Sequence, residues 1–336
     1  MRARLLARTV RGLEALVADE IRTRGLGRVD LIGHREVHFT SPDPAAAIHA
    51  LPTADDVLLV AAVIHGVGHT KDDLHHLVAE LDDLPEPPHT TGIDVSASIV
   101  GPRRFGRYDV EDTVGAHLAA VLGVPYHSRR GGVRPPPGTR AWRVTIEGKR
   151  ATVAVRLGDR PAHRRAYKRA SVPGTLHPPV AAAMVRLAGI APGDLVLDPC
   201  CGAGTLLIEG YATGARLLGA DRDPAALRAA AANATGLGVS WIRADAGALP
   251  VSSGSVDRVL VNPPWQRQVV AAGTLSRAPA RLWAETGRVL RPGGRLVALR
   301  HDGVGPGAGW SVTRTYPIRL AGAEVEIVVA VRGGRR

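Results

Sequence analysis

From about Ser171 onward, short apolar runs alternate regularly with helix-like segments. This alternation predicts a parallel sheet with helices covering both faces. Two last apolar segments flank Gly322 and predict an antiparallel pair that closes the sheet. The parallel strands are expected at residues 195–198, 216–221, 239–244, 256–261 and 294–299, and the closing pair at 313–318 and 323–331.

The first half of the chain has a different pattern, in which strands and helices follow no regular order. The 336 residues, 45% of them hydrophobic, are enough for two separate cores. We place the boundary between them within residues 160–175. Strands are expected at 2–7, 35–40, 56–63 and 92–98, helices at 12–25, 43–51, 72–81 and 110–123, and a hairpin at 141–146 with 151–157.

Positive charge is concentrated in one segment. Residues 101–170 contain 16 Lys or Arg against 5 Asp or Glu, a local net charge of +11, whereas the whole chain carries +12. Such a surface attracts a polyanion such as nucleic acid by neutralising phosphates and releasing counterions. The alternative is a solvated basic face without a partner.

Cysteine usage and hydropathy indicate the compartment. Cys200 and Cys201 are adjacent, which disfavours an ordinary disulfide or a thiolate zinc site, and we expect no metal. No stretch of about 18 apolar residues is present, and the charges at the start of the chain are too closely spaced for a signal peptide. We therefore expect a soluble, cytoplasmic protein without a membrane partner.

A glycine-rich turn, Asp198-Pro-Cys-Cys-Gly-Ala-Gly-Thr205, follows the first parallel strand and enters a helix. Such a turn lets a ligand approach the backbone closely. Dinucleotide-binding proteins use G-x-G-x-x-G here to face a pyrophosphate, but this sequence lacks the full glycine pattern. Asp198 would repel a pyrophosphate and could pair with the cationic amino-acid part of S-adenosylmethionine, so charge favours the methyl donor over a nucleotide-binding dehydrogenase.

Two further acidic residues end the next strands. Asp221 follows about twenty residues later, where a carboxylate can accept the ribose hydroxyl hydrogens, and Asp245 could accept from the adenine amino group. Asp223, before Pro224, is interpreted as a helix cap. The predicted cofactor-binding residues are Asp198, Cys200, Gly202, Gly204, Thr205, Asp221, Asp245, Ala246 and Asn262.

The fourth parallel strand runs into Asn262-Pro-Pro-Trp265. A base-attached amino group is a poor nucleophile, and the Asn262 oxygen with the Pro263 carbonyl could accept its two hydrogens and favour pyramidalisation. Trp265 would stack on a base turned out of its helix. We assign Asn262, Pro263 and Trp265 as catalytic, the alternative being a proline-rich loop closed by a buried tryptophan. Glu209 is interpreted as structural, and Arg267 fits either a phosphate contact or a solvated position.

Over nearly its whole length the chain resembles the THUMP-domain RNA methyltransferases. The resemblance is carried by residues 7–14, by 95–157, which look like THUMP, by the interdomain stretch 163–168, and by the turn at 198–205, which is most similar to the guanine-N2 enzymes. Two positions depart from that pattern, namely Trp265 in place of the usual Tyr and Gln266 in place of a frequent Gly.

The resemblance implies an α/β fold. A Rossmann-like class I methyltransferase domain with a mostly parallel seven-stranded sheet would occupy residues 176–336, preceded by an α+β region. That region would comprise a ferredoxin-like domain (1–65), a THUMP domain (66–160) and a linker (161–175). It also implies that the THUMP domain grips the acceptor end of tRNA. We expect a monomer that uses S-adenosylmethionine. We predict RNA contacts from Arg103, Arg104, Arg107, Arg129, Arg130, Arg164, Arg165 and Lys168.

The leading hypothesis is methylation of guanine N2 in the tRNA acceptor stem, of the position-six type. Alternatives within the enzyme class are an rRNA guanine-N2 or adenine-N6 methyltransferase and a protein glutamine methyltransferase, because all of these use the same Asn-Pro-Pro-aromatic chemistry. A non-enzymatic alternative is an RNA-binding module with a vestigial cofactor site. Intact Asp198, Gly202, Gly204, Asp221 and Asn262 argue against it.

Overall fold

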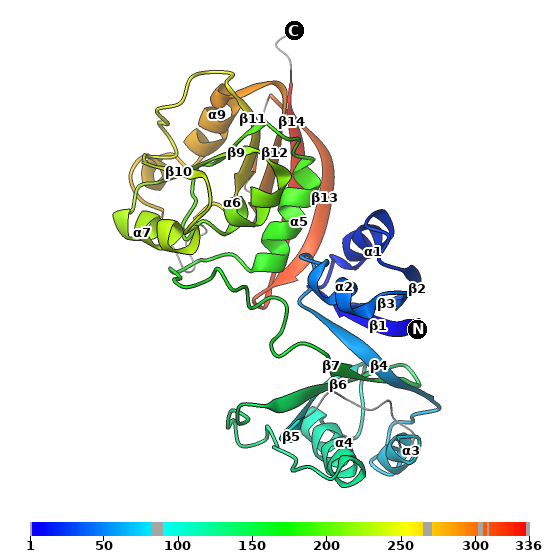
Figure 1. The fold of residues 1–336 in the computed structure, drawn as a ribbon. Coiled ribbons are helices and arrows are strands. Elements are labelled where there is room, and N and C mark those ends of the chain that lie inside the picture. Colours follow the sequence, from blue (N-terminus) through cyan, green and yellow to red (C-terminus); the bar gives the residue numbers. More distant parts are fainter. Residues whose placement is uncertain (1, 82–89, 265–270, 302–304, 308, 334–336) are drawn as a thin grey trace. The chain divides into compact units, whose positions relative to one another are not determined.

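The computed structural model describes residues 2–81, 90–264, 271–301, 305–307 and 309–333 (Figure 1). Contacts divide the chain into two compact units. The first comprises Met1–Thr9 with Val17–Ala162, and the second Val10–Leu16 with His163–Arg336. The short segment 10–16 thus clusters with the carboxy-terminal unit, although it lies near the start of the chain.

The first unit contains one seven-stranded sheet in the order β2-β3-β1-β4-β7-β6-β5. Its long strand β4 (Asp56–His65) pairs antiparallel with β1 on one side and with β7 on the other, so a single sheet runs through both predicted amino-terminal domains. The other strands are β1 (Ala3–Arg8), β2 (Arg28–Gly33), β3 (Glu36–Ser41), β5 (Gly92–Val100), β6 (Thr139–Glu147) and β7 (Arg150–Arg156).

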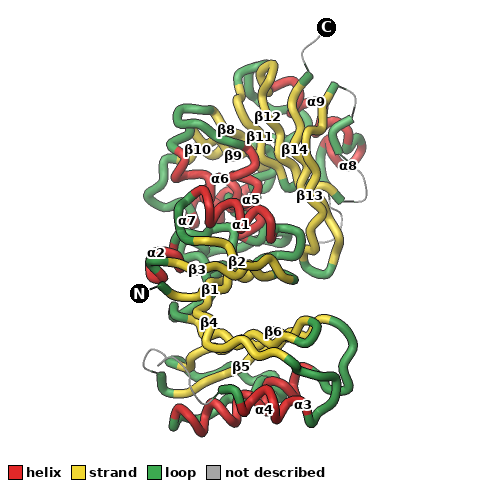
Figure 2. Tube along the Cα trace, turned by 90° about the vertical axis from the view of Figure 1, so that its right-hand side faces the viewer, coloured by secondary structure: helices red, strands yellow, loops and turns green. Residues whose placement is uncertain are grey.

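Helices of the first unit cover this sheet in two groups. α1 (Glu14–Thr23) and α2 (Pro44–His49) pack on β1, β3 and β4, and the Asp43 side chain caps α2 by accepting from the Ala46 amide. α3 (Asp73–Ala79) and α4 (Arg107–Leu122) pack on β5, β6 and β7, and Figure 2 shows both along the same face of these strands.

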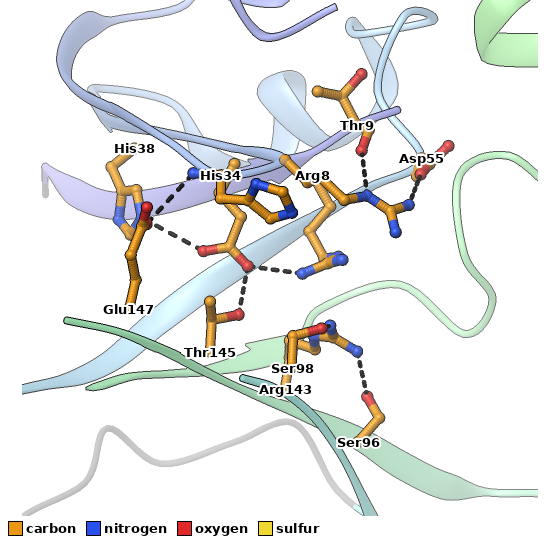
Figure 3. A network of polar contacts seen from close by, with 12 residues as sticks. Arg8, Thr9, His34, His38, Asp55, Ser96, Ser98, Arg143, Thr145 and Glu147 are labelled. Carbon is orange, nitrogen blue, oxygen red and sulfur yellow. Dashed lines mark hydrogen bonds and ion pairs between the residues drawn. The ribbon is translucent and has the colours of Figure 1, made fainter. Parts of the chain in front are cut away.

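A buried polar network crosses the sheet of the first unit (Figure 3). Glu36 accepts hydrogen bonds from Arg8 (2.6 Å) and Thr145 (2.5 Å), and its other oxygen lies 3.6 Å from His38 Nε2. Burial raises the pKa of Glu36, but the bonds from His38, Arg8 and Thr145 outweigh burial and hold it below its usual value. The carboxylate therefore stays charged and compensates the buried Arg8.

Glu36→Gln should lower the free energy of unfolding of the first unit by about 3 kcal/mol, because it leaves the buried Arg8 charge uncompensated. Hydrogen exchange of the β1 and β3 amides measures this loss. Lys71→Met is the control, because it removes an exposed ion pair to Asp109 (3.4 Å) and should cost less than about 1 kcal/mol. Equal effects of the two substitutions would contradict the prediction.

The second unit contains the expected mostly parallel seven-stranded sheet, in the order β10-β9-β8-β11-β12-β14-β13. The first five strands of this order are parallel, and β14 and β13 form the expected antiparallel closing pair. Their bounds are β8 (Leu195–Asp198), β9 (Arg216–Asp221), β10 (Val239–Arg243), β11 (Val256–Val261), β12 (Leu290–Arg300), β13 (Trp310–Leu320) and β14 (Ala323–Arg332).

Helices cover both faces of this sheet because its strands alternate their side chains between two cores. Val196 and Leu260 pack in one core with α5 and α6, whereas Leu197 and Val259 pack in the other with α9. The helices are α5 (Pro178–Ala188), α6 (Thr205–Gly210), the 3-10 turn η1 (Tyr211–Thr213), α7 (Pro224–Asn233), α8 (Thr274–Arg277) and α9 (Ala280–Val289).

Candidate active site

Three predicted site residues end neighbouring parallel strands. β8 lies between β9 and β11, and Asp198, Asp221 and Asn262 lie at or just after the carboxyl ends of β8, β9 and β11 respectively. Carboxyl ends of parallel strands share one edge of the sheet, which is where open α/β folds bind ligands. The strand order thus brings the glycine turn and the Asn-Pro-Pro segment to adjacent positions.

The carboxylates of Asp198 and Asp221 hold the glycine turn in shape. Asp198 is 1% exposed and its Oδ1 accepts from the Cys200 amide at 3.1 Å, while Asp221 Oδ2 accepts from the Gly202 amide at 2.9 Å. Burial raises the pKa of Asp198 to about 8, against the lowering effect of the Cys200 amide and with a further rise from the Asp221 charge. A cation placed beside Asp198 would therefore favour its ionised form.

Gly202 and Gly204 both have the left-handed backbone conformation, with φ of +50° and +80°. At Gly204 a second constraint applies, because a Cβ there would lie 2.7 Å from Trp241 Cη2 and 3.2 Å from Ala230 Cβ. Gly204 is thus required by the turn and by packing against α7 and β10. Thr205, which follows it, is buried at the start of α6.

Three aspartates lie close enough to the glycine turn to affect the pKa of the Cys200 thiol. Burial comes first among the causes that raise the pKa of the Cys200 thiol, followed by the negative charges of Asp198, Asp221 and Asp245. Burial, followed by the negative charges of Asp198 and Asp221, also raises the pKa of the Cys201 thiol. Both cysteines are therefore neutral thiols in a negatively charged environment, which suits a cationic ligand and disfavours a pyrophosphate.

Asp245 lies just after β10 and organises a second turn. Its Oδ1 accepts from the Gly247 amide and its Oδ2 from the Thr274 amide, each at 2.9 Å. Burial would raise the pKa of Asp245, but these amides lower it below its usual value, so the residue carries a full negative charge. Ala246 is buried beside it. Asp223 caps α7 through the Ala225 amide, as expected.

The acceptor side of the site begins at Asn262, whose Nδ2 donates to the Gly174 carbonyl at 3.3 Å. Pro263 follows, partly buried, at the same edge of the sheet. Trp265 and Arg267, the other two residues considered for this segment, lie outside the described residues. The link from Asn262 to Gly174 joins segments 88 residues apart and was not predicted from the sequence.

The predicted RNA-contacting residues of the first unit differ in how their side chains are engaged. Arg104 and Arg107 are exposed, and the Arg107 guanidinium lies over the Tyr108 ring, 4.4 Å from its centroid. Arg107 also donates to the Tyr108 hydroxyl (2.6 Å). Arg103 bonds to Pro102 O (3.0 Å), and the exposed Arg129 and Arg130 bond to Asp94 and to Asp112 (2.8 Å) respectively.

In the second unit, Arg164 and Lys168 are exposed, whereas Arg165 forms an ion pair with Glu209 on α6 at 2.8 Å. Glu209 also accepts from the Tyr167 hydroxyl at 2.7 Å. These bonds agree with the structural interpretation of Glu209. They also show that the Arg165 side chain attaches the segment around residues 165–167 to α6.

Within the described ranges, the structure contains no cluster of three or more His, Cys, Asp or Glu side chains suited to a metal ion. None of the helices found there has both the length and the apolar character needed to cross a membrane.

Comparison with known proteins agrees with this geometry. Residues 165–304 match a family described as RMKL-like, methyltransferase domain. A curated protein of Thermus thermophilus, named tRNA (guanine(6)-N2)-methyltransferase, is 34% identical over 221 residues, which cover 64% of each chain. The tRNA (guanine(10)-N2)-dimethyltransferase of Methanothermobacter thermautotrophicus is 34% identical over 116 residues, covering 34% of this chain and 33% of that relative.

The chain therefore spans 64% and 33% of the lengths of these two relatives. Among solved structures, TrmN from Thermus thermophilus matches with a TM-score of 0.80 and 27% identity, covering 99% of this chain and 100% of that one. This match confirms the expected fold class. Residues 165–304 thus resemble the RMKL-like methyltransferase domain, and over 99% of its length the chain has the fold of TrmN.

Proposed function

We propose that this protein transfers a methyl group from S-adenosylmethionine to the exocyclic N2 of a guanosine in tRNA, in the acceptor stem and of the position-six type. One observation carries the proposal: the acidic glycine turn after β8 and the Asn-Pro-Pro segment after β11 end neighbouring strands of the sheet. The names of the two curated relatives support guanine N2 of tRNA as the acceptor.

The residues of the turn fit the methyl donor. Asp198 and Asp221 end β8 and β9, Asp245 follows β10, and these three acidic residues raise the pKa of the Cys200 thiol, which supports a cationic ligand at the turn. Asp198 would face the cationic amino-acid part, Asp221 the ribose hydroxyls, and Asp245 with the Ala246 amide the adenine ring. When bound, S-adenosylmethionine supplies a methyl group attached to a positively charged sulfur.

The acceptor residues would prepare the amino group for transfer. The Asn262 Oδ1 and the Pro263 carbonyl would accept its two hydrogens, which favours pyramidalisation and makes the nitrogen lone pair available. Proline has no amide hydrogen, so the backbone at Pro263 offers no N–H donor that could compete with the amino group for the Pro263 carbonyl. Trp265 would stack on the base.

Purified protein incubated with labelled methyl donor and bulk tRNA, followed by digestion to nucleosides, tests this function. We expect labelled N2-methylguanosine. Label in N6-methyladenosine would favour the adenine alternative, label in added protein would favour the glutamine alternative, and absence of label from every acceptor would contradict methyl transfer.

The remaining assignments are part of the same proposal. Residues 1–65 would form the ferredoxin-like domain, 66–160 the THUMP domain and 161–175 the linker, and the protein would act as a cytoplasmic monomer. Its basic surface would bind the phosphate backbone of the RNA, and the exposed cations among the predicted contacts are Arg104, Arg107, Arg129, Arg130, Arg164 and Lys168.

Arg104→Glu and Arg107→Glu should each weaken RNA binding about three- to tenfold at low salt and reduce the salt dependence of affinity by about one counterion, because each removes a phosphate contact. Fluorescence anisotropy with labelled tRNA at several salt concentrations measures both. Arg22→Glu, an exposed arginine on α1, is the matched control and should change neither. If all three variants behave alike, the basic segment is only a solvated face.

A further inference from the structure

The loop formed by residues 163–177 is built into the second unit and closes on itself. The rings of His163 and His177, at its two ends, lie 5.3 Å apart between centroids. Near its start, Glu209 of α6 holds it twice, through Arg165 (2.8 and 3.3 Å) and through the Tyr167 hydroxyl. The loop is thus anchored to the helix that follows the glycine turn.

Asn233, at the end of α7, clamps the middle of the loop to the glycine turn. It is 4% exposed, and its side-chain oxygen accepts from the amides of Arg169 and Ala170, both at 2.9 Å. Its amide group donates to the carbonyls of Ala170 (2.9 Å) and Ala203 (3.0 Å). Since Ala203 belongs to the glycine turn, this one side chain fixes the loop against the proposed donor site.

The next residues of the loop form a turn that is closed by the backbone bond from the Thr175 amide to the Val172 carbonyl (3.1 Å) and reinforced by the Thr175 hydroxyl. Thr175 Oγ1 accepts from the Val172 amide (2.9 Å) and donates to the Val172 carbonyl (2.6 Å). Gly174, inside this turn, has φ of +74°. Its carbonyl accepts the hydrogen bond from Asn262 Nδ2.

The Gly174 carbonyl selects one orientation of the Asn262 carboxamide. With Nδ2 directed at Gly174 O, Oδ1 lies on the opposite side of the planar group. Turning the carboxamide over would replace the hydrogen bond with two oxygens facing each other, which is unfavourable. The proposed chemistry depends on Oδ1 as an acceptor, and the hydrogen bond to the loop favours the orientation in which Oδ1 points away from Gly174.

We propose that the 163–177 loop is a positioning element of the methyltransferase site, in which Thr175 locks the turn that orients Asn262 through the Gly174 carbonyl. This role rests on the proposed function for its catalytic consequence, although the orientation of Asn262 can be measured without any substrate. Asn233 bonds the same loop to the glycine turn. The loop therefore contacts both the proposed donor-binding turn and the proposed catalytic residue Asn262.

The sequence makes a direct test available, because Asn233 and Asn262 are the only two asparagines in the chain. Selective labelling with ¹⁵N-asparagine gives two side-chain amide pairs, and Asn262→Asp assigns them by removing one. In Thr175→Val, exchange of the Asn262 side-chain hydrogens with water should accelerate about tenfold while the Asn233 pair is unchanged. Thr175→Ser should restore the slow exchange.

Thr235→Val is the matched control, since Thr235 makes the same kind of hydroxyl bond, to Ala232 O at 2.8 Å, just after α7. It should leave both amide pairs unchanged. Unchanged exchange of Asn262 in Thr175→Val would overturn the proposal, whether or not the protein methylates RNA.

Methylation kinetics provide a second, independent test of the role of Thr175. Thr175→Val should lower kcat about tenfold with the KM values for donor and RNA within about twofold, and Thr175→Ser should recover the rate. In the Asn262→Asp background, which keeps an acceptor oxygen but has no Nδ2, Thr175→Val should cause no further loss. An equal loss in both backgrounds would show that Thr175 does not act through Asn262 and would overturn the proposal.

Discussion

Asn262→Ala lowers the turnover of methyl transfer by about a hundredfold to a thousandfold, the size expected when one preorganised hydrogen-bonding group at a reacting centre is removed. Asn262 follows β11 directly and its carboxamide is held by Gly174, so its loss removes the acceptor for one amino hydrogen. Binding of donor and RNA should change less than about threefold, because the basic surface and the aspartates are untouched.

Single-turnover rates with saturating donor and tRNA measure this effect, and separate binding titrations check that both ligands still bind. Asn233→Asp is unsuitable as a control because it alters the support of the loop. Ser276→Ala, in α8, is the better control and should retain wild-type turnover. Wild-type turnover in Asn262→Ala would remove Asn262 from the mechanism.

Asp198→Asn should weaken the affinity for S-adenosylmethionine about a hundredfold, because it removes the buried carboxyl group that we propose faces the cationic part of the donor. Folding should be preserved, since an asparagine oxygen can still accept from the Cys200 amide. Isothermal titration measures the affinity. Asp223→Asn, which alters only the exposed cap of α7, is the control. A loss below about threefold in Asp198→Asn would contradict the assigned role.

The pH dependence of donor binding gives a second measure of Asp198. Its pKa, raised by burial to about 8, leaves the carboxyl protonated in the unliganded protein at lower pH, and the ionised form appears only as the pH rises. A cationic donor prefers that form, so affinity should increase up to about tenfold per pH unit from pH 6 and level off near pH 8. Asp198→Asn should abolish this dependence.

The sheet of the second unit was predictable because its strands carry clear local signals. Asp198, Asp221 and Asn262 end apolar runs, and parallel strands place such ends at one edge whatever the details of the loops. Two strands are longer than predicted: β13 spans 310–320 rather than 313–318, and β12 begins at Leu290 rather than at 294, because it continues through Pro292 and Gly293, residues that normally interrupt strands.

The first unit was less predictable. β2 was missed, because Arg28–Gly33 mixes charged and apolar residues and is largely exposed, so no burial pattern marks it as a strand. The continuous sheet through β4 was also not foreseen, since strand pairing between distant segments leaves no local trace in one sequence. The network around Glu36 was not foreseen for the same reason, because it joins residues as far as 109 positions apart.

At the site, the sequence indicated which residue types carry the chemistry but not what holds them. Asn233, Gly174 and Thr175 act through contacts that form only when the 163–177 loop folds onto the sheet. A usable signal existed at Asn233, because asparagine occurs only twice in this chain and one of the two is the proposed catalytic residue.

The central claim is that this chain methylates guanine N2 in tRNA, and nucleoside mapping of tRNA from cells with and without the gene tests it most directly. We predict that N2-methylguanosine is lost from an acceptor-stem position in cells without the gene and returns when the wild-type gene, but not Asn262→Ala, is restored. An unchanged set of methylated guanosines in the two cell lines would contradict the claim.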